Sequence, residues 1–382
     1  MIEGLKIGMD GKRAVNNNTG LGNYSRLVVD VLSEKYPANE YRLYVPQMRH
    51  NPRLAPLLER DNVKVVTPVS RWGRIAPSIW RVSGVTDQIK ADKVDLFHGL
   101  SNELPLNISD CGIPSVVTIH DLIFRRFPEY YKAADRRIYD YKFERAAVNA
   151  TRVIAITECT KRDIVDMYHI PEDKIDVVYQ GCHEAFGHDI SPVLMDEVAA
   201  LYSLPERYII AVGTVESRKN QLLAVKALER LDDDVQLLIV GRRTGYADEI
   251  DRYVADHGLT ARVRFLEGVP FDHLPALYAM ARLSSYTSRF EGFGIPVIES
   301  ISTGTPVIAA TGSSLEEAGG PGAVYVDPDD VEAYVTAARM LIDNDARRRD
   351  MVIHGQSYIT RFSPENFAAG LMDSYSKSLN NA

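Results

Sequence analysis

The stretch YIIAVGTVESRKNQLLAVKALER, residues 208–230, contains a strand, a loop and a helix in direct succession. Tyr208–Val212 is a short, continuously apolar run, as expected for a strand buried on both faces of a parallel sheet. Leu222–Arg230 has the apolar spacing of a helix, and a second apolar run follows at Val235–Val240. A strand, a helix and another strand in this order form a right-handed parallel crossover. The stretch therefore predicts a parallel sheet covered by helices.

The same alternation extends over the rest of the 382 residues, a length that by itself favours two domains. In the second half we expect further strands at Arg262–Phe265, Arg282–Tyr286 and Pro306–Ala309, and further helices at Asp248–His257, Leu274–Ala281 and Pro296–Thr303. In the first half we expect helices at Asn23–Lys35 and Ala133–Asn149, and strands at Leu5–Met9, Tyr41–Val45, Val63–Val66, Asp95–His98, Ser115–Ile119, Arg152–Ile156 and Ile175–Val178. The pattern predicts an α/β protein with two doubly wound, Rossmann-like domains.

The two alternating series are separated by Gly181–Pro205, a segment without strand-like runs. We therefore expect an N-terminal domain over residues 1–184 and a second domain over residues 205–360. The segment Pro364–Leu379 again has helical spacing, with Ser363 placed to cap it and Pro364 at its first position. Ligands of doubly wound sheets bind at the carboxyl ends of the strands, so two such domains predict a cleft for substrates between them.

Composition excludes several classes of protein. The net charge of −8, with the acidic excess in the second half, argues against general binding of nucleic acids. No apolar run of 18 residues is present, and the segment Met1–Ile7 lacks the apolar core of a signal peptide. The three cysteines are too few and too scattered for a disulfide framework or a zinc site, which favours a reducing cytoplasm.

The segment RFEGFGIPVIE, residues 289–299, follows a predicted strand and leads into a predicted helix. Gly292 and Gly294 let the backbone approach a ligand closely, just before the free N–H groups of a helix start. Such a start binds anions, and a diphosphate fits it. Glu291 and Glu299 flank this position and can accept hydrogen bonds from the hydroxyl groups of a nucleotide-sugar. The alternative is a glycine-rich turn capped by an acidic first helical turn.

The loop GTVESRKN, residues 213–220, places two adjacent cations just after a predicted strand. Arg218 can hold phosphate oxygens in a bidentate manner, and Lys219 can neutralise a diphosphate as a point charge. The alternative is a solvated pair of surface cations.

Two segments of the first half also carry candidate residues. His120 and Asp121 follow the apolar run Ser115–Ile119, at the strand end where site residues gather, although a structural histidine within the core is the alternative. The segment NTGLGNY, residues 18–24, lacks the third glycine of a dinucleotide-binding fingerprint and is weak evidence for NAD. We expect it to form a flexible loop that lets a ligand approach the N-terminal domain.

The order and spacing of these four segments resemble glycosyltransferase family 4, whose members are retaining enzymes of the GT-B architecture. The resemblance covers nearly the whole chain. Its most specific elements are the E-x7-E pattern from Glu291 to Glu299 and the segment Gly213–Asn220. The segments Thr118–Asp121 and Phe127–Tyr131 look like the mannosyltransferase branch. Thr214, where many members carry an arginine, is one departure, and Arg218 would then supply that charge.

The resemblance implies a role for each matching position. His120 would touch the transferred sugar near the reacting carbon, with Asp121 beside it, and Glu291 would contact sugar hydroxyls. Glu299 would bind the nucleotide ribose. Gly20 and Asn23 would lie on the acceptor side, where Gly22 would contact both substrates. The remaining donor-binding residues would be Gly213, Arg218, Lys219, Gly292, Phe293, Gly294 and Ile295.

In this family the C-terminal helix crosses back onto the first domain, which suits residues 364–382. Retention is usually explained there by attack from the face that the diphosphate leaves, with the leaving phosphate taking the acceptor proton. We expect no tightly bound cofactor or metal, because Asp232–Asp234 and Asp327–Asp329 are better explained as turns than as metal-binding motifs.

The resemblance implies a nucleotide-sugar donor, with GDP-mannose the first expectation and a UDP-sugar the second. The acceptor would be a glycan or a lipid-linked glycan. A basic, aromatic composition at Arg71–Arg74 and Trp80–Arg81, with more cations at Arg125, Arg126, Lys132, Arg136 and Arg137, suits peripheral contact with an anionic membrane. A solvated helix face is the alternative. Competing functions are a nucleotide-sugar epimerase and a catalytically silent subunit that binds nucleotide-sugars.

Overall fold

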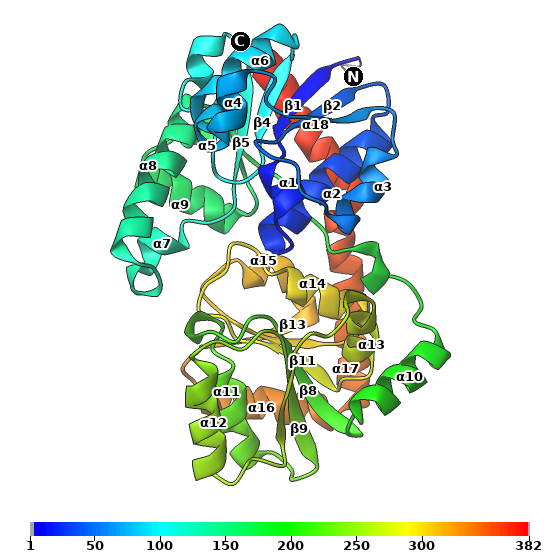
Figure 1. Cartoon of the computed structure of the whole chain (residues 1–382). Helices are drawn as coiled ribbons and strands as arrows, with labels where there is room; N and C mark the ends of the chain where they lie inside the picture. Colours follow the sequence, from blue (N-terminus) through cyan, green and yellow to red (C-terminus); the bar gives the residue numbers. More distant parts are fainter. Residues whose placement is uncertain (1–3, 381–382) are drawn as a thin grey trace. The chain divides into compact units, whose positions relative to one another are not determined.

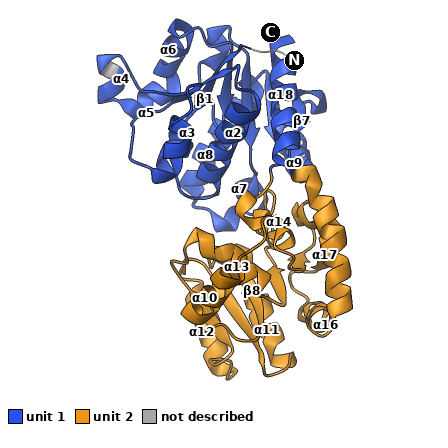
Figure 2. Ribbon diagram, turned by 90° about the vertical axis from the view of Figure 1, so that its right-hand side faces the viewer, with its two compact units in different colours: residues 1–180, 363–382 blue, residues 181–362 orange. Residues whose placement is uncertain are grey.

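A computed structural model describes residues 4–380 of the chain, which divide into two compact units (Figure 2). Unit 1 consists of Met1–Gln180 together with Ser363–Ala382, and unit 2 consists of Gly181–Phe362. No helix among the described residues is long and apolar enough to cross a membrane.

Unit 1 is built on a seven-stranded parallel sheet in the order β3-β2-β1-β4-β5-β6-β7 (Figure 1). Ile7 of β1 pairs with Tyr41 of β2 on one side and with Leu96 of β4 on the other, so the strand order reverses between β1 and β4. The strands are β1 (Lys6–Asp10), β2 (Glu40–Tyr44), β3 (Val63–Val66), β4 (Leu96–Gly99), β5 (Ser115–Ile119), β6 (Arg152–Ala155) and β7 (Ile175–Val177).

Helices surround this sheet. They are α1 (Lys12–Asn16), α2 (Gly20–Lys35), α3 (Ala55–Leu58), α4 (Arg71–Ile75), α5 (Pro77–Ile79), α6 (Val85–Ala91), α7 (Ile123–Arg126), α8 (Ala133–Asn149), α9 (Glu158–Tyr168) and α18 (Pro364–Asn380). A π-helical turn, η2 (Trp80–Gly84), connects α5 to α6. The apolar strands β5 and β6 bury their side chains against α8 and α9, which gives unit 1 a continuous core.

The helix α18 packs against α2 and against strands β4, β5 and β6 of unit 1 (Figure 1). Phe367 and Tyr375 are fully buried there, and the Tyr375 hydroxyl lies 2.7 Å from Nδ1 of His98. The Asn366 N–H donates to Oγ of Ser363 at 3.2 Å, so the predicted helix cap is confirmed. Residues that follow unit 2 in the sequence therefore belong to the core of unit 1.

Unit 2 has a six-stranded parallel sheet in the order β10-β9-β8-β11-β12-β13. The strands are β8 (Arg207–Val212), β9 (Val235–Val240), β10 (Val263–Leu266), β11 (Leu283–Tyr286), β12 (Val307–Ala310) and β13 (Ala323–Val326). Its helices are α10 (Pro192–Tyr202), α11 (Leu222–Ala227), α12 (Ala247–Asp256), α13 (Leu274–Ala279), α14 (Ile295–Ser302), α15 (Leu315–Gly319), α16 (Val331–Ile342) and α17 (Asp345–Ile359). The order reverses between β8 and β11, which is the Rossmann pattern.

These two sheets confirm the predicted α/β fold with two Rossmann-like units. Two local expectations differ from the structure. The sequence pattern does not predict the edge strand β13, because its apolar run is short and most of its side chains are only half-buried. The helix α2 begins at Gly20 instead of Asn23, so the expected flexible loop is wrong for Gly20–Gly22, which form the first helical turn.

Candidate active-site residues

The predicted cation pair lies at the carboxyl end of β8, in the short turn η7 (Ser217–Lys219). The turn ends at Asn220, whose backbone is in the left-handed region with φ of 54°. Asn220 is buried, its Nδ2 donates to the Pro328 carbonyl at 2.7 Å, and its own carbonyl accepts from Oγ1 of Thr287 at 3.0 Å. These contacts hold the loop that carries the two cations in one conformation.

Arg218 and Lys219 converge on Glu291, which lies 72 residues after Lys219 in the sequence. Nζ of Lys219 lies 2.5 Å from Oε1 of Glu291, and a guanidinium nitrogen of Arg218 lies 2.9 Å from the same oxygen. The three side chains are only 14%, 16% and 12% exposed for Lys219, Arg218 and Glu291. The structure therefore brings these three candidate residues together, and the ion pairs of Glu291 are not a feature that the sequence predicts.

The charges of this cluster support one another. Burial alone would raise the pKa of Glu291, but Lys219 and then Arg218 outweigh burial and lower that pKa to about 2. Burial opposes the charge on Lys219, and Glu291 nevertheless raises the pKa of Lys219 above its usual range. All three groups are thus ionised at neutral pH, with one more positive than negative charge among them.

Tyr286 completes the cluster, although it is not among the predicted site residues. Its hydroxyl lies 2.5 Å from Nζ of Lys219 and donates to Oε1 of Glu291 at 3.1 Å. Burial raises the pKa of Tyr286 to about 12. The available signal is its position, since Tyr286 is the last residue of β11 and lies three residues before the glycine-rich segment.

The glycine-rich segment leads into α14, as predicted. Gly294 has a φ of +132°, a backbone conformation that favours glycine, and a Cβ added there would lie 2.7 Å from Cδ2 of Leu315, whose side chain would have to move. Oγ of Ser314 lies 2.8 and 2.7 Å from the carbonyl oxygens of Glu291 and Phe293, so its single hydroxyl hydrogen can bond to either. Among the described residues, no side chain caps the start of α14 at Gly294. The partial positive charge at this end of the helix can therefore attract an anion. Ile295 is its first residue.

Glu299 lies one turn further along α14 and is half-buried. Burial raises the pKa of its carboxyl from 4.5 to about 7, and the nearby Tyr278 hydroxyl opposes this change only in part. Glu291 and Glu299 therefore have opposite electrostatic environments, although both belong to the E-x7-E pattern. Gly213 directly follows the last residue of β8 and has a φ of +143°.

In unit 1, His120 directly follows β5 and is 6% exposed. Its ring Nε2 lies 2.9 Å from the Leu100 carbonyl oxygen, and its backbone N–H donates to Oδ1 of Asn102 at 2.7 Å. Burial lowers the pKa of His120 to about 4, so the ring is neutral at physiological pH and Nε2 carries the proton. The adjacent Asp121 accepts a hydrogen bond at Oδ1 from the Ile123 N–H at 3.1 Å.

The glycines at the start of α2 have different surroundings. A Cβ at Gly22 would lie 1.9 Å from the Asn17 carbonyl oxygen, so this glycine permits a close approach of backbone segments. Gly20 is exposed and would tolerate a side chain in open space. Oδ1 of Asn23 accepts from a guanidinium nitrogen of Arg26 at 2.6 Å.

The sequence predicts a basic, aromatic surface around residues 71–81, and this prediction is wrong for Trp80 and Arg81. Trp80 is 5% exposed, and the Arg81 side chain is 12% exposed and ion-paired to Asp10 and Glu103. Arg125 and Arg126 pair with acidic side chains of α8 and α9. The side chain of Trp72 lies outside the described part of the structure.

The two Asp-rich segments form turns. The Val235 N–H donates to the Asp232 carbonyl at 3.0 Å, and the Asp329 N–H donates to Oδ1 of Asp327 at 2.8 Å. Within residues 4–380, no three His, Cys, Asp or Glu side chains are grouped as metal ligands would be.

Comparisons with known proteins agree with this arrangement. Residues 201–358 match the family model of Glycosyl transferases group 1, and residues 27–186 match that of Glycosyltransferase Family 4. O-antigen chain mannosyltransferase B of Escherichia coli is 25% identical over 94% of this chain and 96% of its own length. O-antigen chain mannosyltransferase RfbU of Salmonella typhimurium is 26% identical over 79% of this chain and 80% of its own.

Among solved structures, Anabaena Alr3699/HepE in complex with UDP and glucose is similar, with a TM-score of 0.76 and 19% identity over 97% of this chain and 99% of that one. At this level of identity the likeness concerns the fold. The two family models between them span most of the chain, and the mannosyltransferase relatives match along most of their length. The chain belongs to glycosyltransferase family 4 and has the GT-B fold.

Proposed function

We propose that this glycosyltransferase moves mannose from GDP-mannose to a hydroxyl of a glycan or lipid-linked glycan, with retention of the anomeric configuration. The observation that carries the proposal is the convergence of Lys219 and Arg218 on Glu291 beside the uncapped start of α14. The names of the two mannosyltransferase relatives support the choice of sugar. A UDP-sugar is the second candidate donor, supported by the UDP in the similar Anabaena structure.

The cluster suggests how a diphosphate enters the site. Before the donor binds, Glu291 pairs with both Lys219 and Arg218, and Arg218 also pairs with Glu216. A diphosphate then takes the place of the Glu291 carboxylate at the cations and receives N–H donors at the start of α14. Glu291 is thereby released to accept hydrogen bonds from sugar hydroxyls, and Glu299 accepts hydrogen bonds from the ribose.

During transfer, the bond between the anomeric carbon and the phosphate oxygen breaks, and a bond from the acceptor oxygen to that carbon forms. The acceptor proton passes to an oxygen of the leaving diphosphate. Arg218, Lys219 and the helix start stabilise the negative charge that develops on this group. His120 is neutral and buried, so its proposed role is to contact the sugar near the reacting carbon, with Asp121 beside it.

The remaining predicted residues line the substrates. Gly20 and Asn23 are proposed on the acceptor side, where Gly22 also serves the donor. The backbone at Gly213, Gly292, Phe293 and Ile295 is proposed to contact the donor. The proposed location is the cytoplasm, at the periphery of the inner face of the membrane.

The test is a thermal-shift panel of nucleotide-sugars on the intact chain, followed by proton NMR of the anomeric configuration in the product. A bound donor raises the melting temperature by mass action. We expect GDP-mannose to give the largest shift and the product to keep the configuration of the donor. If neither a GDP-sugar nor a UDP-sugar changes the melting temperature, the proposal is wrong. An isomerised donor without an acceptor product would identify an epimerase, and donor binding without turnover a silent subunit.

The variant Lys219→Ala tests the cation pair. We expect the donor Kd to rise at least 10-fold, which corresponds to about 1.4 kcal/mol. The fold should persist, because Arg218 still pairs with Glu291. Arg347→Ala, at an exposed cation of α17, is the matched control and should leave the Kd unchanged. Equal effects of both variants would contradict a role of Lys219 in binding the diphosphate.

A further inference from the structure

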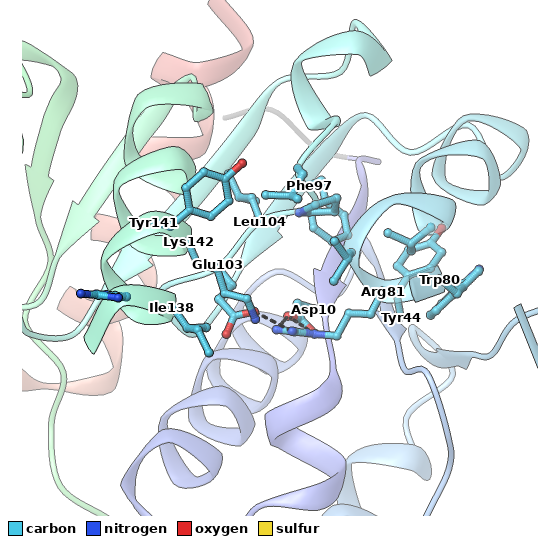
Figure 3. A pocket seen from close by; sticks show the side chains of 15 residues that line it. Asp10, Tyr44, Trp80, Arg81, Phe97, Glu103, Leu104, Ile138, Tyr141 and Lys142 are labelled. Carbon is cyan, nitrogen blue, oxygen red and sulfur yellow. Dashed lines mark hydrogen bonds and ion pairs between the residues drawn. The ribbon is translucent and has the colours of Figure 1, made fainter. Parts of the chain in front are cut away.

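A cavity of about 260 Å³ lies in unit 1 at the carboxyl end of its sheet (Figure 3). Asp10 is the last residue of β1, and Glu103 lies in the loop after β4; both line the cavity. The strand order reverses between these two strands. In doubly wound sheets this switch point is where ligands bind. The cavity therefore occupies the position at which unit 1 is expected to hold a ligand of its own.

Most side chains that line the cavity are apolar. Aliphatic groups predominate over aromatic ones and come from η2, α6, the loop after β4 and α8, among them Val82, Val85, Leu104, Leu106 and Ile138. A sugar ring needs polar partners for its hydroxyls, whereas an aliphatic chain gains from being removed from water in such a cavity. The lining thus favours hydrocarbon over carbohydrate.

The charges at the cavity have two different arrangements. Arg81 bridges Asp10 and Glu103, with 2.7 Å to Glu103, and Nζ of Lys142 lies 3.3 Å from Glu103 (Figure 3). These two cations and two carboxylates neutralise one another. Arg137, a further lining residue, is exposed and makes no side-chain hydrogen bond or ion pair with residues 4–380. The cavity lining therefore carries one uncompensated positive charge.

This charge lies where the apolar lining meets solvent. Ile138 and Tyr141 of α8 are 52% and 56% exposed, and both line the cavity. Arg137 precedes Tyr141 by four residues on the same helix, so the two share a face. An apolar cavity whose rim carries exposed apolar groups and an unpaired cation is complementary to an aliphatic chain with an anionic head group.

We propose that the cavity binds the aliphatic chain of an amphipathic molecule whose phosphate head group pairs with Arg137. This inference rests on the proposed function, under which the molecule is the acceptor, a glycan linked through phosphate to a lipid. The chain enters between η2 and α8, and Arg81, fixed between its two carboxylates, closes the polar end of the cavity.

The test uses decyl phosphate below its micellar concentration as the probe, titrated into the intact protein by calorimetry. Inorganic phosphate and decyl glucoside are the comparison probes, since each carries only one half of the proposed chemistry. We expect decyl phosphate to bind at least 10-fold more tightly than either. Binding no tighter than that of inorganic phosphate would overturn the proposal.

Four variants of α8 separate the two halves of the site. Ile138→Asp should weaken the binding of decyl phosphate at least 10-fold. Arg137→Glu should reduce the affinity for decyl phosphate to the affinity for decyl glucoside. Val148→Asp and Arg145→Glu change exposed residues of the same helix that do not line the cavity, and should have no effect. If the control variants weaken binding as much as the cavity variants, the probe binds elsewhere and the proposal is wrong.

The proposed function has a separate readout, because Arg218 and Lys219, the cations proposed to bind the donor diphosphate, belong to unit 2. All four variants should keep the thermal shift produced by the donor, and an unchanged calorimetric unfolding transition of unit 1 shows that they fold. Decyl phosphate binding without any response to nucleotide-sugars would refute the proposed function and leave the cavity as a lipid-phosphate site. Donor binding without decyl phosphate binding would refute only the inference about the cavity.

Discussion

The carboxyl of Glu299 offers a test in which donor binding and stability respond in opposite directions. Burial raises its pKa from 4.5 to about 7 in the folded protein. A ribose that donates two hydroxyl hydrogen bonds to this residue requires the ionised carboxylate. The structure therefore holds Glu299 in an environment that disfavours the form proposed to bind the donor, and Glu299→Gln removes this conflict.

The expected magnitude follows from the change in pKa. A difference between 4.5 and about 7 corresponds to about 3 kcal/mol in favour of the neutral form. Between these values the folded state binds more protons than the unfolded state, so stability decreases as the pH rises from 4.5 through 7. Glu299→Gln has no such proton to lose. It should be more stable than the unmodified protein at pH 8, by up to about 3 kcal/mol, and show a much smaller difference at pH 4.5.

Donor binding has the opposite dependence. If only the carboxylate binds ribose, the donor Kd should rise about 10-fold between pH 8 and pH 6. Glu299→Gln should bind the donor more weakly at pH 8 and lose this dependence on pH. Denaturant unfolding gives the stability, and calorimetric titration with the donor gives the Kd at each pH. A variant that is no more stable at pH 8, or a donor Kd that does not change with pH in the unmodified protein, would refute the reasoning.

Two further predictions concern the backbone and the core. Gly294→Ala should cost about 1–3 kcal/mol of stability because of its positive φ, and should also weaken donor binding, since Leu315 must move; Gly245→Ala, where a Cβ meets open space, is the control, and equal losses in both would contradict the explanation. Phe367→Ala should destabilise unit 1 by about 3–5 kcal/mol and leave unit 2 unaffected, so calorimetry should show only one of two transitions shifted; a single transition that shifts as a whole would contradict this.

Much of the fold is predictable because the parallel strands are continuous apolar runs. The predicted strands at Val63–Val66, Ser115–Ile119 and Val235–Val240 have the same ends as β3, β5 and β9. At the sheet edge this signal weakens, since β13 keeps several of its side chains half-exposed. The beginning of α2 was missed because two of its first three residues are glycines, which have low helix propensity, and tertiary packing at Gly22 overrides that preference.

For the candidate site, the sequence predicts where each residue lies along its own strand, loop or helix, but not which distant residues it contacts. Gly294 and Lys219 are correctly predicted to lie in loops at the ends of strands, because strand–loop–helix order determines that position. The pairing of Glu291 with Lys219 joins residues 72 positions apart, and no local pattern reports it. Arg81 shows the same limit, since its partner Asp10 is 71 residues away and a buried arginine has no local sequence signal that distinguishes it from an exposed one.

The membership of α18 in unit 1 has a consequence for biosynthesis. Unit 2 is contiguous in sequence and can acquire all its contacts as soon as Phe362 has left the ribosome. Unit 1 emerges first, but Phe367 and Tyr375 leave the ribosome only after Phe362. Until then, the surface of unit 1 that α18 covers next to α2 stays exposed to solvent. The order in which the two units begin to emerge and the order in which each has all its residues outside the ribosome are thus reversed.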